Sequence, residues 1–123
     1  MSLAFTFPGR LKSPNEILGR HWRTKHRERK RLSLEILVAI RRGKVDYPMN
    51  VRVTQFRKRM LDPDNLVGSC KPLLDALKGL GWLVDDRAKW CTLHVEQRKP
   101  AAGAIEEVRL ELEQAGKRKE GGE

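Results

Sequence analysis

Two kinds of hydrophobic spacing follow one another along this 123-residue chain, and their order restricts the architectures it can adopt. Five short segments are predicted to be extended, most of them because apolar and polar residues alternate as in half-buried strands. They cover residues 3–7, 50–56, 82–84, 90–97 and 107–113. Two longer segments, residues 24–42 and a stretch after residue 65 that ends at Gly79 and Gly81, carry the apolar stripe of a helix.

The order strand, helix, strand, helix and then strands predicts an α+β fold, with a small mixed β-sheet and two main helices packed on it. A chain of this length supports one hydrophobic core, so a single domain is expected over residues 1–114. Residues 115–123 are charged and glycine-rich and are predicted to form a flexible tail. One sheet edge or helical face would stay apolar, which is compatible with a homodimer but does not establish one.

The charge of the chain favours an anionic partner. Lys and Arg number 26 against 16 Asp and Glu, a formal net charge of +10, and nucleic acid is the first candidate. A membrane surface is less favoured because no basic helix shows a large apolar face. Without a bilayer-spanning segment or a signal-peptide pattern, a cytoplasmic location is expected. Cys70 and Cys91 would then be reduced, structural thiols.

Asp62 and Asp64 flank Pro63 and form the first part of a candidate metal site. Proline pushes the residue before it out of the helical conformation, and an extended backbone would point both carboxylates the same way. Such anions repel unless a cation lies between them, and oxygen ligands suit Mg²⁺ or Mn²⁺. Asp86 follows an apolar segment and could return to the same site. Both Asp62-Pro63-Asp64 and the adjacent pair Asp85-Asp86 also have an ordinary interpretation, as turns and helix caps.

Three stretches of the sequence resemble the RusA family of Holliday-junction resolvases. Residues 62–66 read DPDNL, residues 71–77 read KPLLDAL and residues 81–86 read GWLVDD. The family pattern is D-x-D-N-L, a lysine, D-A-L and a closing D-D, a combination far more specific than one acidic pair. The resemblance implies that Asp62, Asp64 and Asp86 hold the metal, Mg²⁺ or Mn²⁺, and that Lys71 is the essential lysine.

Lys71 follows a departure from this pattern, because Gly68-Ser69-Cys70 is an insertion relative to the family spacing. If the three residues form a bulge or a loose turn, Lys71 reaches the acidic residues. If they extend a regular helix, Lys71 is rotated by about 300°. In the catalytic interpretation Lys71 stabilises charge on the phosphorane or the leaving oxygen. In the alternative it pairs with Asp75 on a helix surface.

Two basic segments are predicted to contact DNA phosphates. The first is the densest basic block, between residues 20 and 31, and the second ends a predicted strand shortly before Asp62. The residues assigned to DNA binding are Arg20, Arg23, Lys25, Arg27, Arg57, Lys58 and Arg59. The alternative for the first block is a solvated helix face.

These features predict a metal-dependent endodeoxyribonuclease, encoded by a bacterium or a phage, that resolves Holliday junctions by paired phosphodiester hydrolysis. The preference for four-way DNA and the homodimer follow from the resemblance alone. One alternative is a non-catalytic basic DNA-binding module in which the acidic turn is only a helix cap. Another is a broader structure-specific or RNA-directed nuclease that uses the same site.

Overall fold

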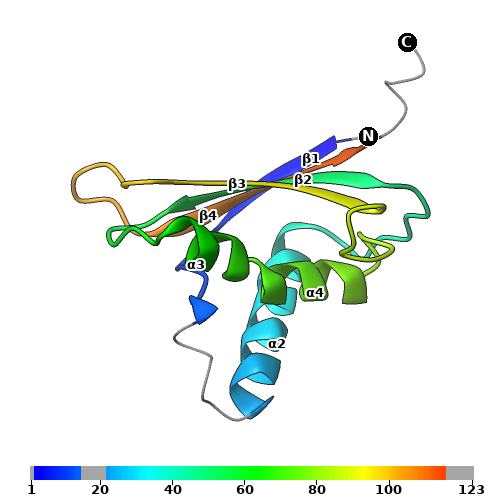
Figure 1. The fold of residues 1–123 in the computed structure, drawn as a ribbon, viewed down its shortest axis with the longest axis horizontal. Helices are drawn as coiled ribbons and strands as arrows, with labels where there is room; N and C mark the ends of the chain where they lie inside the picture. The colour runs from blue at the N-terminus through cyan, green and yellow to red at the C-terminus, as the bar shows by residue number, and fades with distance from the viewer. Residues whose placement is uncertain (1, 15–21, 116–123) are drawn as a thin grey trace.

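The computed structural model describes residues 2–14 and 22–115, and it confirms the α+β class. Four strands form one mixed sheet, and the helices cover one of its faces (Figure 1). The strands are β1 (Ser2–Pro8), β2 (Met49–Phe56), β3 (Cys91–Arg98) and β4 (Glu107–Gln114), and the helices are α2 (Trp22–Ala39), α3 (Pro63–Gly68) and α4 (Lys71–Gly79). Apart from residue 115, the predicted tail lies outside the described residues.

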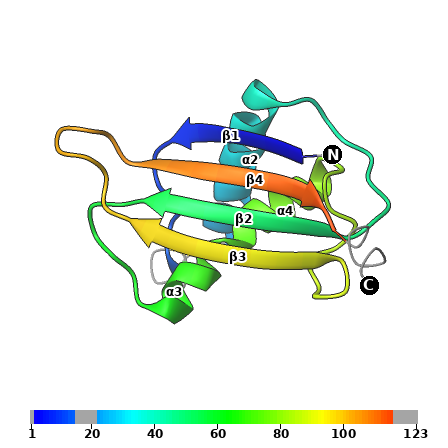
Figure 2. The same ribbon diagram turned by 90° about the horizontal axis from the view of Figure 1, so that it is seen from above.

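The strand order β1-β4-β2-β3 places the last strand of the sequence between the first two (Figure 2). β4 runs antiparallel to both neighbours, so that Leu110 lies opposite Phe5 of β1 and Val53 of β2. β2 and β3 are parallel, and parallel neighbours require a crossover connection. α3 and α4 form this crossover, so the carboxyl end of β2 leads directly into the acidic turn.

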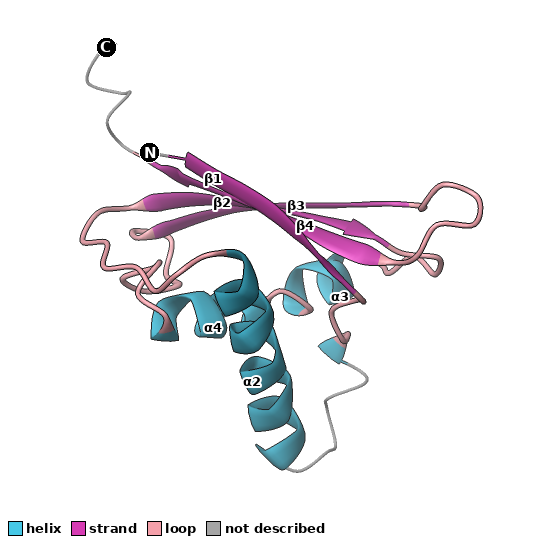
Figure 3. Cartoon of the chain, turned by 180° about the vertical axis from the view of Figure 1, so that it is seen from behind, coloured by secondary structure: helices cyan, strands magenta, loops and turns pink. Residues whose placement is uncertain are grey.

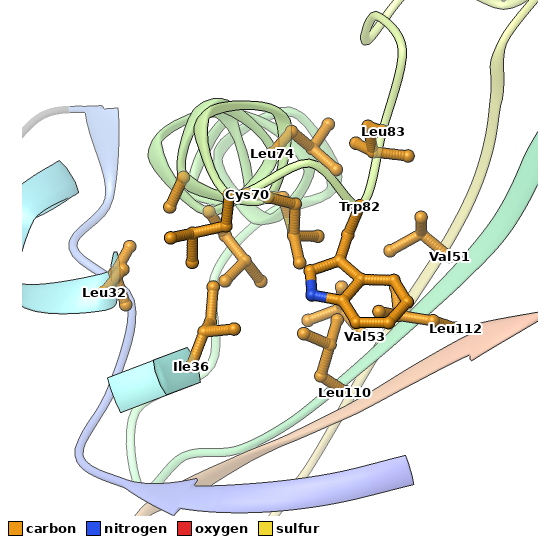
Figure 4. Packing of buried hydrophobic residues seen from close by; sticks show 14 of the residues in the cluster. Leu32, Ile36, Val51, Val53, Cys70, Leu74, Trp82, Leu83, Leu110 and Leu112 are labelled. Carbon is orange, nitrogen blue, oxygen red and sulfur yellow. The ribbon is translucent and has the colours of Figure 1, made fainter. Parts of the chain in front are cut away.

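The hydrophobic core lies between the sheet and the helices. Inward positions of β2 and β4 and one stripe of each long helix supply its side chains, as the two spacings in the sequence predicted. Fully buried members include Val51, Val53, Leu110 and Leu112 of the sheet, and Leu32, Ile36, Leu73 and Leu77 of the helices. Figure 4 shows the strand side chains pointing toward those of the helices, with the indole of Trp82 in the same cluster.

The helices differ from the prediction at their ends. α2 spans Trp22–Ala39 rather than residues 24–42, and the helix expected after residue 65 is two helices separated at Ser69 and Cys70. Within the described ranges, no helix combines the length and the apolar character needed to cross a membrane.

Residues 82–84 were predicted to be extended, and this prediction is wrong. They belong to a loop between α4 and β3. The loop pairs with the segment after α2 instead of joining the sheet, because the backbone N–H of Gly43 donates to Leu80 O at 2.8 Å and that of Val45 to Gly81 O at 2.9 Å. The indole Nε1 of Trp82 also donates to Arg41 O at 2.9 Å. These bonds fix the start of the loop that carries Asp86.

Both cysteines are buried free thiols, as predicted. Burial raises the pKa of Cys70 to about 12 and that of Cys91 to about 11. A thiol with such a pKa stays protonated and unreactive near neutral pH, so both side chains serve packing.

Gly81 is the backbone position in this loop that tolerates a side chain least. Its φ is +91°, and a Cβ there would lie 1.9 Å from the carbonyl oxygen of Gly43. Gly81→Ala should lower the free energy of unfolding by about 3 kcal/mol or more, because the clash adds to the cost of left-handed backbone. Gly103→Ala is the matched control, since its φ is +81° with nothing within 4 Å, and it should lose only about 1 kcal/mol. Equal losses in urea denaturation would contradict this prediction.

Candidate active site

Asp62 caps the N-terminus of α3. Its backbone is extended, with φ −71° and ψ 165°, as Pro63 predicted. Oδ1 accepts a hydrogen bond from the backbone N–H of Asn65 at 2.8 Å, and Oδ2 accepts one from Asn65 Nδ2 at 3.1 Å. Such a cap satisfies an otherwise unpaired helix donor. The ordinary interpretation of this turn is therefore present in the structure, and Asp62 remains exposed to solvent.

Asp64 lies in the first turn of α3 and is also exposed. The prediction that one extended backbone aligns the two carboxylates is wrong, because the helix begins at Pro63 and Asp64 is helical. An acidic residue is stabilised in a first turn by the unpaired N–H groups of the helix. Asp62 and Asp64 thus share the exposed N-terminal end of one short helix.

Lys71, Asp75 and Asp86 form an ion-pair cluster. Lys71 Nζ donates a hydrogen bond to Asp86 Oδ2 and lies 3.1 Å from Asp75 Oδ1. The Asp86 side chain is 19% exposed, whereas that of Lys71 is 60% exposed. The hydrogen bond to Asp86 raises the pKa of Lys71 against the opposing effect of burial, and Asp75 adds to the rise. Lys71 therefore remains an ammonium group well into the alkaline range.

The turn at Ser69 and Cys70 brings Lys71 to Asp86. α3 ends at Gly68, the first of the three inserted residues, and α4 begins at Lys71 (Figure 3). Ser69 and Cys70 therefore form a turn that interrupts the helix. Ser69 Oγ donates to Leu66 O at 2.6 Å and accepts from Gln55 Nε2 at 2.9 Å. Of the two conformations considered for the insertion, the loose turn is confirmed.

Asp85 fixes the turn that carries Asp86. Asp85 Oδ2 accepts from Arg87 Nε at 2.7 Å, and its Oδ1 accepts from the backbone N–H of Asp86 at 2.8 Å. Lys78 Nζ lies 3.5 Å from the same Oδ1. The hydrogen bond from Arg87, followed by that from the Asp86 backbone, lowers the pKa of Asp85 to about 2. Asp85 is therefore ionised at all ordinary pH values.

The structure brings Lys71 to Asp86 rather than bringing three carboxylates to one point. Among residues 2–14 and 22–115, no three His, Cys, Asp or Glu side chains gather closely enough to hold a metal ion. Asp62 and Asp64 lie at one end of α3, while Asp86 is paired with the ammonium group at the start of α4.

Gln55 and Arg57 belong to a buried polar network that the sequence analysis missed. Arg57 Nη1 donates to Gln55 Oε1 and to Leu11 O, both at 2.9 Å, and Gln55 Nε2 donates to Ser69 Oγ. Gln55 is fully buried and Arg57 is 3% exposed. We call these two residues and Ser69, with the carbonyls of Leu11 and Leu66, the Gln55 network. Throughout the described ranges, every buried side-chain nitrogen or oxygen has a partner.

The assignment of Arg57 to DNA binding is wrong, because its side chain points into the protein and donates to main-chain carbonyls. A signal was present in the sequence, since Gln55 and Arg57 continue the inward-facing alternation of Val51 and Val53. Of the other residues assigned to DNA binding, Arg20 lies outside the described residues, and those exposed to solvent are Arg23, Lys25, Arg27, Lys58 and Arg59.

In comparisons with known proteins, no protein-family model and no curated protein matches the chain. The roles of Asp62, Asp64, Lys71 and Asp86 therefore depend on their chemistry, their geometry and the likeness of their sequence pattern.

Loss of the Arg57 guanidinium should destabilise the protein. Arg57→Gln should lower the free energy of unfolding by about 2–3 kcal/mol, because it removes charged hydrogen bonds to Leu11 O and Arg59 O. Lys58→Gln is the control, since Lys58 is the exposed neighbour and should change stability by less than about 0.5 kcal/mol. Thermal or urea unfolding measures both, and an Arg57→Gln variant as stable as the control would refute the structural role.

Proposed function

We propose that this protein is a divalent-metal-dependent DNA endonuclease of the RusA type that resolves four-way junctions. The contact between Lys71 and Asp86 carries the proposal. The two residues are 15 positions apart and belong to separate stretches of the resemblance. The turn at Ser69 and Cys70, within the insertion, starts α4 at Lys71 and so lets Lys71 reach Asp86. Their meeting at a partly exposed surface supports a shared role.

Asp62, Asp64 and Asp86 are the residues proposed to hold Mg²⁺ or Mn²⁺. Mg²⁺ commonly binds through one or two carboxylates while it keeps waters and contacts substrate phosphates. Two exposed aspartates at one helix end meet that requirement, and Asp86 is the third proposed ligand. A divalent ion bound there would neutralise the phosphodiester and lower the pKa of an attacking water.

Lys71 is proposed to stabilise negative charge on the phosphate during cleavage. Because its pKa is raised by Asp86, Lys71 stays charged near neutral pH and does not act as a general base. The side chain is largely exposed, which leaves room for a phosphate group to approach. A positioned ammonium group that meets developing charge is a strong contributor to catalysis.

The segment between β2 and α3 supports a nucleic-acid substrate. Lys58 and Arg59 are exposed a few residues before Asp62. Gln97 of β3 fixes this segment, since its Oε1 accepts from Leu61 N at 3.0 Å and its Nε2 donates to Leu61 O at 2.7 Å. Two cations are thereby held beside the acidic turn. The preference for four-way DNA and the homodimer with one site per subunit are proposed from the resemblance.

A non-catalytic DNA-binding module is the second candidate, and two observations favour it. Asp62 already caps α3 through both carboxylate oxygens, and Asp86 is already neutralised by Lys71. Such a module would bind DNA in a salt-dependent manner without metal-dependent cleavage.

Removal of one proposed metal ligand separates the two candidates. Asp64→Asn should reduce cleavage of a mobile four-way junction by about 100-fold or more while binding of the junction persists, because it removes an exposed carboxylate and no core contact. Asp46→Asn is the control, an exposed aspartate outside the three stretches. Chelation of divalent metal should also abolish wild-type cleavage. Full activity of Asp64→Asn would refute the assignment, and a comparison of junctions, flaps, linear duplex and RNA tests the substrate class.

Replacement of the proposed catalytic lysine tests its electrostatic role. Lys71→Met should lower the cleavage rate by about 10²- to 10³-fold, with partial recovery in Lys71→Arg. Lys78→Met is the control on the same helix, because Lys78 pairs with Asp85 instead of Asp86. Since the pKa of Lys71 is raised, its charge persists as pH rises, and the wild-type rate should not fall between about pH 7 and 9. Equal rates for Lys71→Met and Lys78→Met would leave Lys71 without a catalytic role.

A further inference from the structure

A pocket of about 370 Å³ opens between the loop after β1 and the first half of α2. Its lining is mostly cationic and comprises Arg10, Lys12, Thr24, Arg27, Glu28 and Arg31. Four basic side chains thus face one carboxylate. Of these residues, only Arg27 was assigned to DNA binding from the sequence.

The loop that carries Arg10 and Lys12 is held in place from both sides. Leu11 is fully buried and Ser13 is 6% exposed, whereas the neighbouring Arg10 and Lys12 are exposed to solvent. Arg57 Nη1 donates to Leu11 O, and Arg31 Nη2 donates to Arg10 O at 3.0 Å. The two guanidinium groups fix the backbone on either side of the pocket wall, which preorganises it for a ligand.

The buried carboxylate of Glu28 orients one wall of the pocket. Glu28 is 3% exposed and accepts hydrogen bonds from Arg31 Nε at 3.1 Å and from Nη2 at 2.9 Å. Such a two-point pair restrains the guanidinium plane. It offsets the charge of Arg31, while Lys12 and Arg27 add further positive charge to the pocket.

The pocket is also linked to the acidic helix. Pro14, at the end of the loop, packs on the end of α3, where a Cβ at Gly68 would lie 2.6 Å from Pro14 Cγ. The segment that presents Arg10 and Lys12 is therefore in contact with the helix that presents Asp62 and Asp64.

We propose that this pocket binds a backbone phosphate of DNA, at a site separate from Asp62, Asp64, Lys71 and Asp86. Guanidinium and ammonium donors converging with a hydroxyl match the oxygens of a phosphate. Exposed Arg23 and Lys25 continue the basic surface along α2, which fits an extended polyanion better than a small acid. The inference rests on the proposed function in taking DNA as the ligand. Its effect is to hold the strand in a fixed position relative to α3.

The test is equilibrium binding of a labelled four-way junction to the full chain, measured by fluorescence anisotropy in EDTA over a salt series. Lys12→Gln/Arg27→Gln should weaken binding about tenfold or more near 0.1 M salt and reduce the slope of log K against log salt by about 1–2. Arg42→Gln/Lys44→Gln is the control, because it removes the same charge from exposed residues beyond the other end of α2. Its slope should equal that of the wild type.

The outcomes separate this inference from the nuclease proposal, because no cleavage occurs in EDTA. If the pocket variant has the same slope of log K against log salt as the control variant, the proposal that the pocket binds phosphate is refuted. This holds whether or not the wild type cuts junctions with metal. Pocket-dependent binding by a wild type that never cleaves would overturn the nuclease alone. Absence of any binding by the wild type would overturn the pocket as well. If the double variant unfolds, Lys12→Gln alone should give about half the change in slope.

Discussion

The Gln55 network is the constraint on which the functional half of this molecule depends. It runs from Leu11 O through Arg57 and Gln55 to Ser69 and Leu66 O, beneath the sheet. Buried polar groups are costly unless every one is paired, so these groups specify where three segments meet. The loop after β1, the end of β2 and the break between the crossover helices are thereby fixed together. The sheet supplies the frame, and this network places the segments that carry charge.

Both proposals draw on that arrangement in different ways. The break after Ser69 starts a new helix at Lys71 and lets its ammonium group meet Asp86, whereas the carbonyl of Leu11 fixes the basic loop beside α2. One buried hydrogen-bonded chain thus connects a group proposed to act on the reacting phosphate with groups proposed to hold a phosphate elsewhere. Arg57 contacts no substrate in either proposal. It can nevertheless affect substrate binding, because its hydrogen bond to Leu11 O fixes the basic loop.

Hydrophobic period allowed most of the fold to be predicted from the sequence. Residues 50–56 and 107–113 alternate clearly, and both are strands within one residue of the predicted bounds.

The short apolar run at 82–84 has no such period, and its hydrogen bonds to the segment after α2 decide its conformation. The sequence left two conformations open for the insertion, because the helix break depends on Ser69 meeting Gln55, distant along the chain. The extended backbone of Asp62 was predicted because Pro63 acts locally. Arg57 was wrongly assigned to DNA binding from its charge alone. Its place in the inward-facing alternation of β2 would have predicted a buried side chain.

The position of β4 has a consequence for how the chain acquires its structure. β1 and β2 do not pair with each other; each pairs with the strand formed last, residues 107–114. During synthesis on the ribosome, β1 therefore has no partner in this sheet until residues 107–114 have emerged. Assembly then requires contacts between distant parts of the sequence, which generally slows folding. A chain cut short before β4 would lose the strand that joins β1 to β2, and its remaining strands would expose edges prone to aggregation.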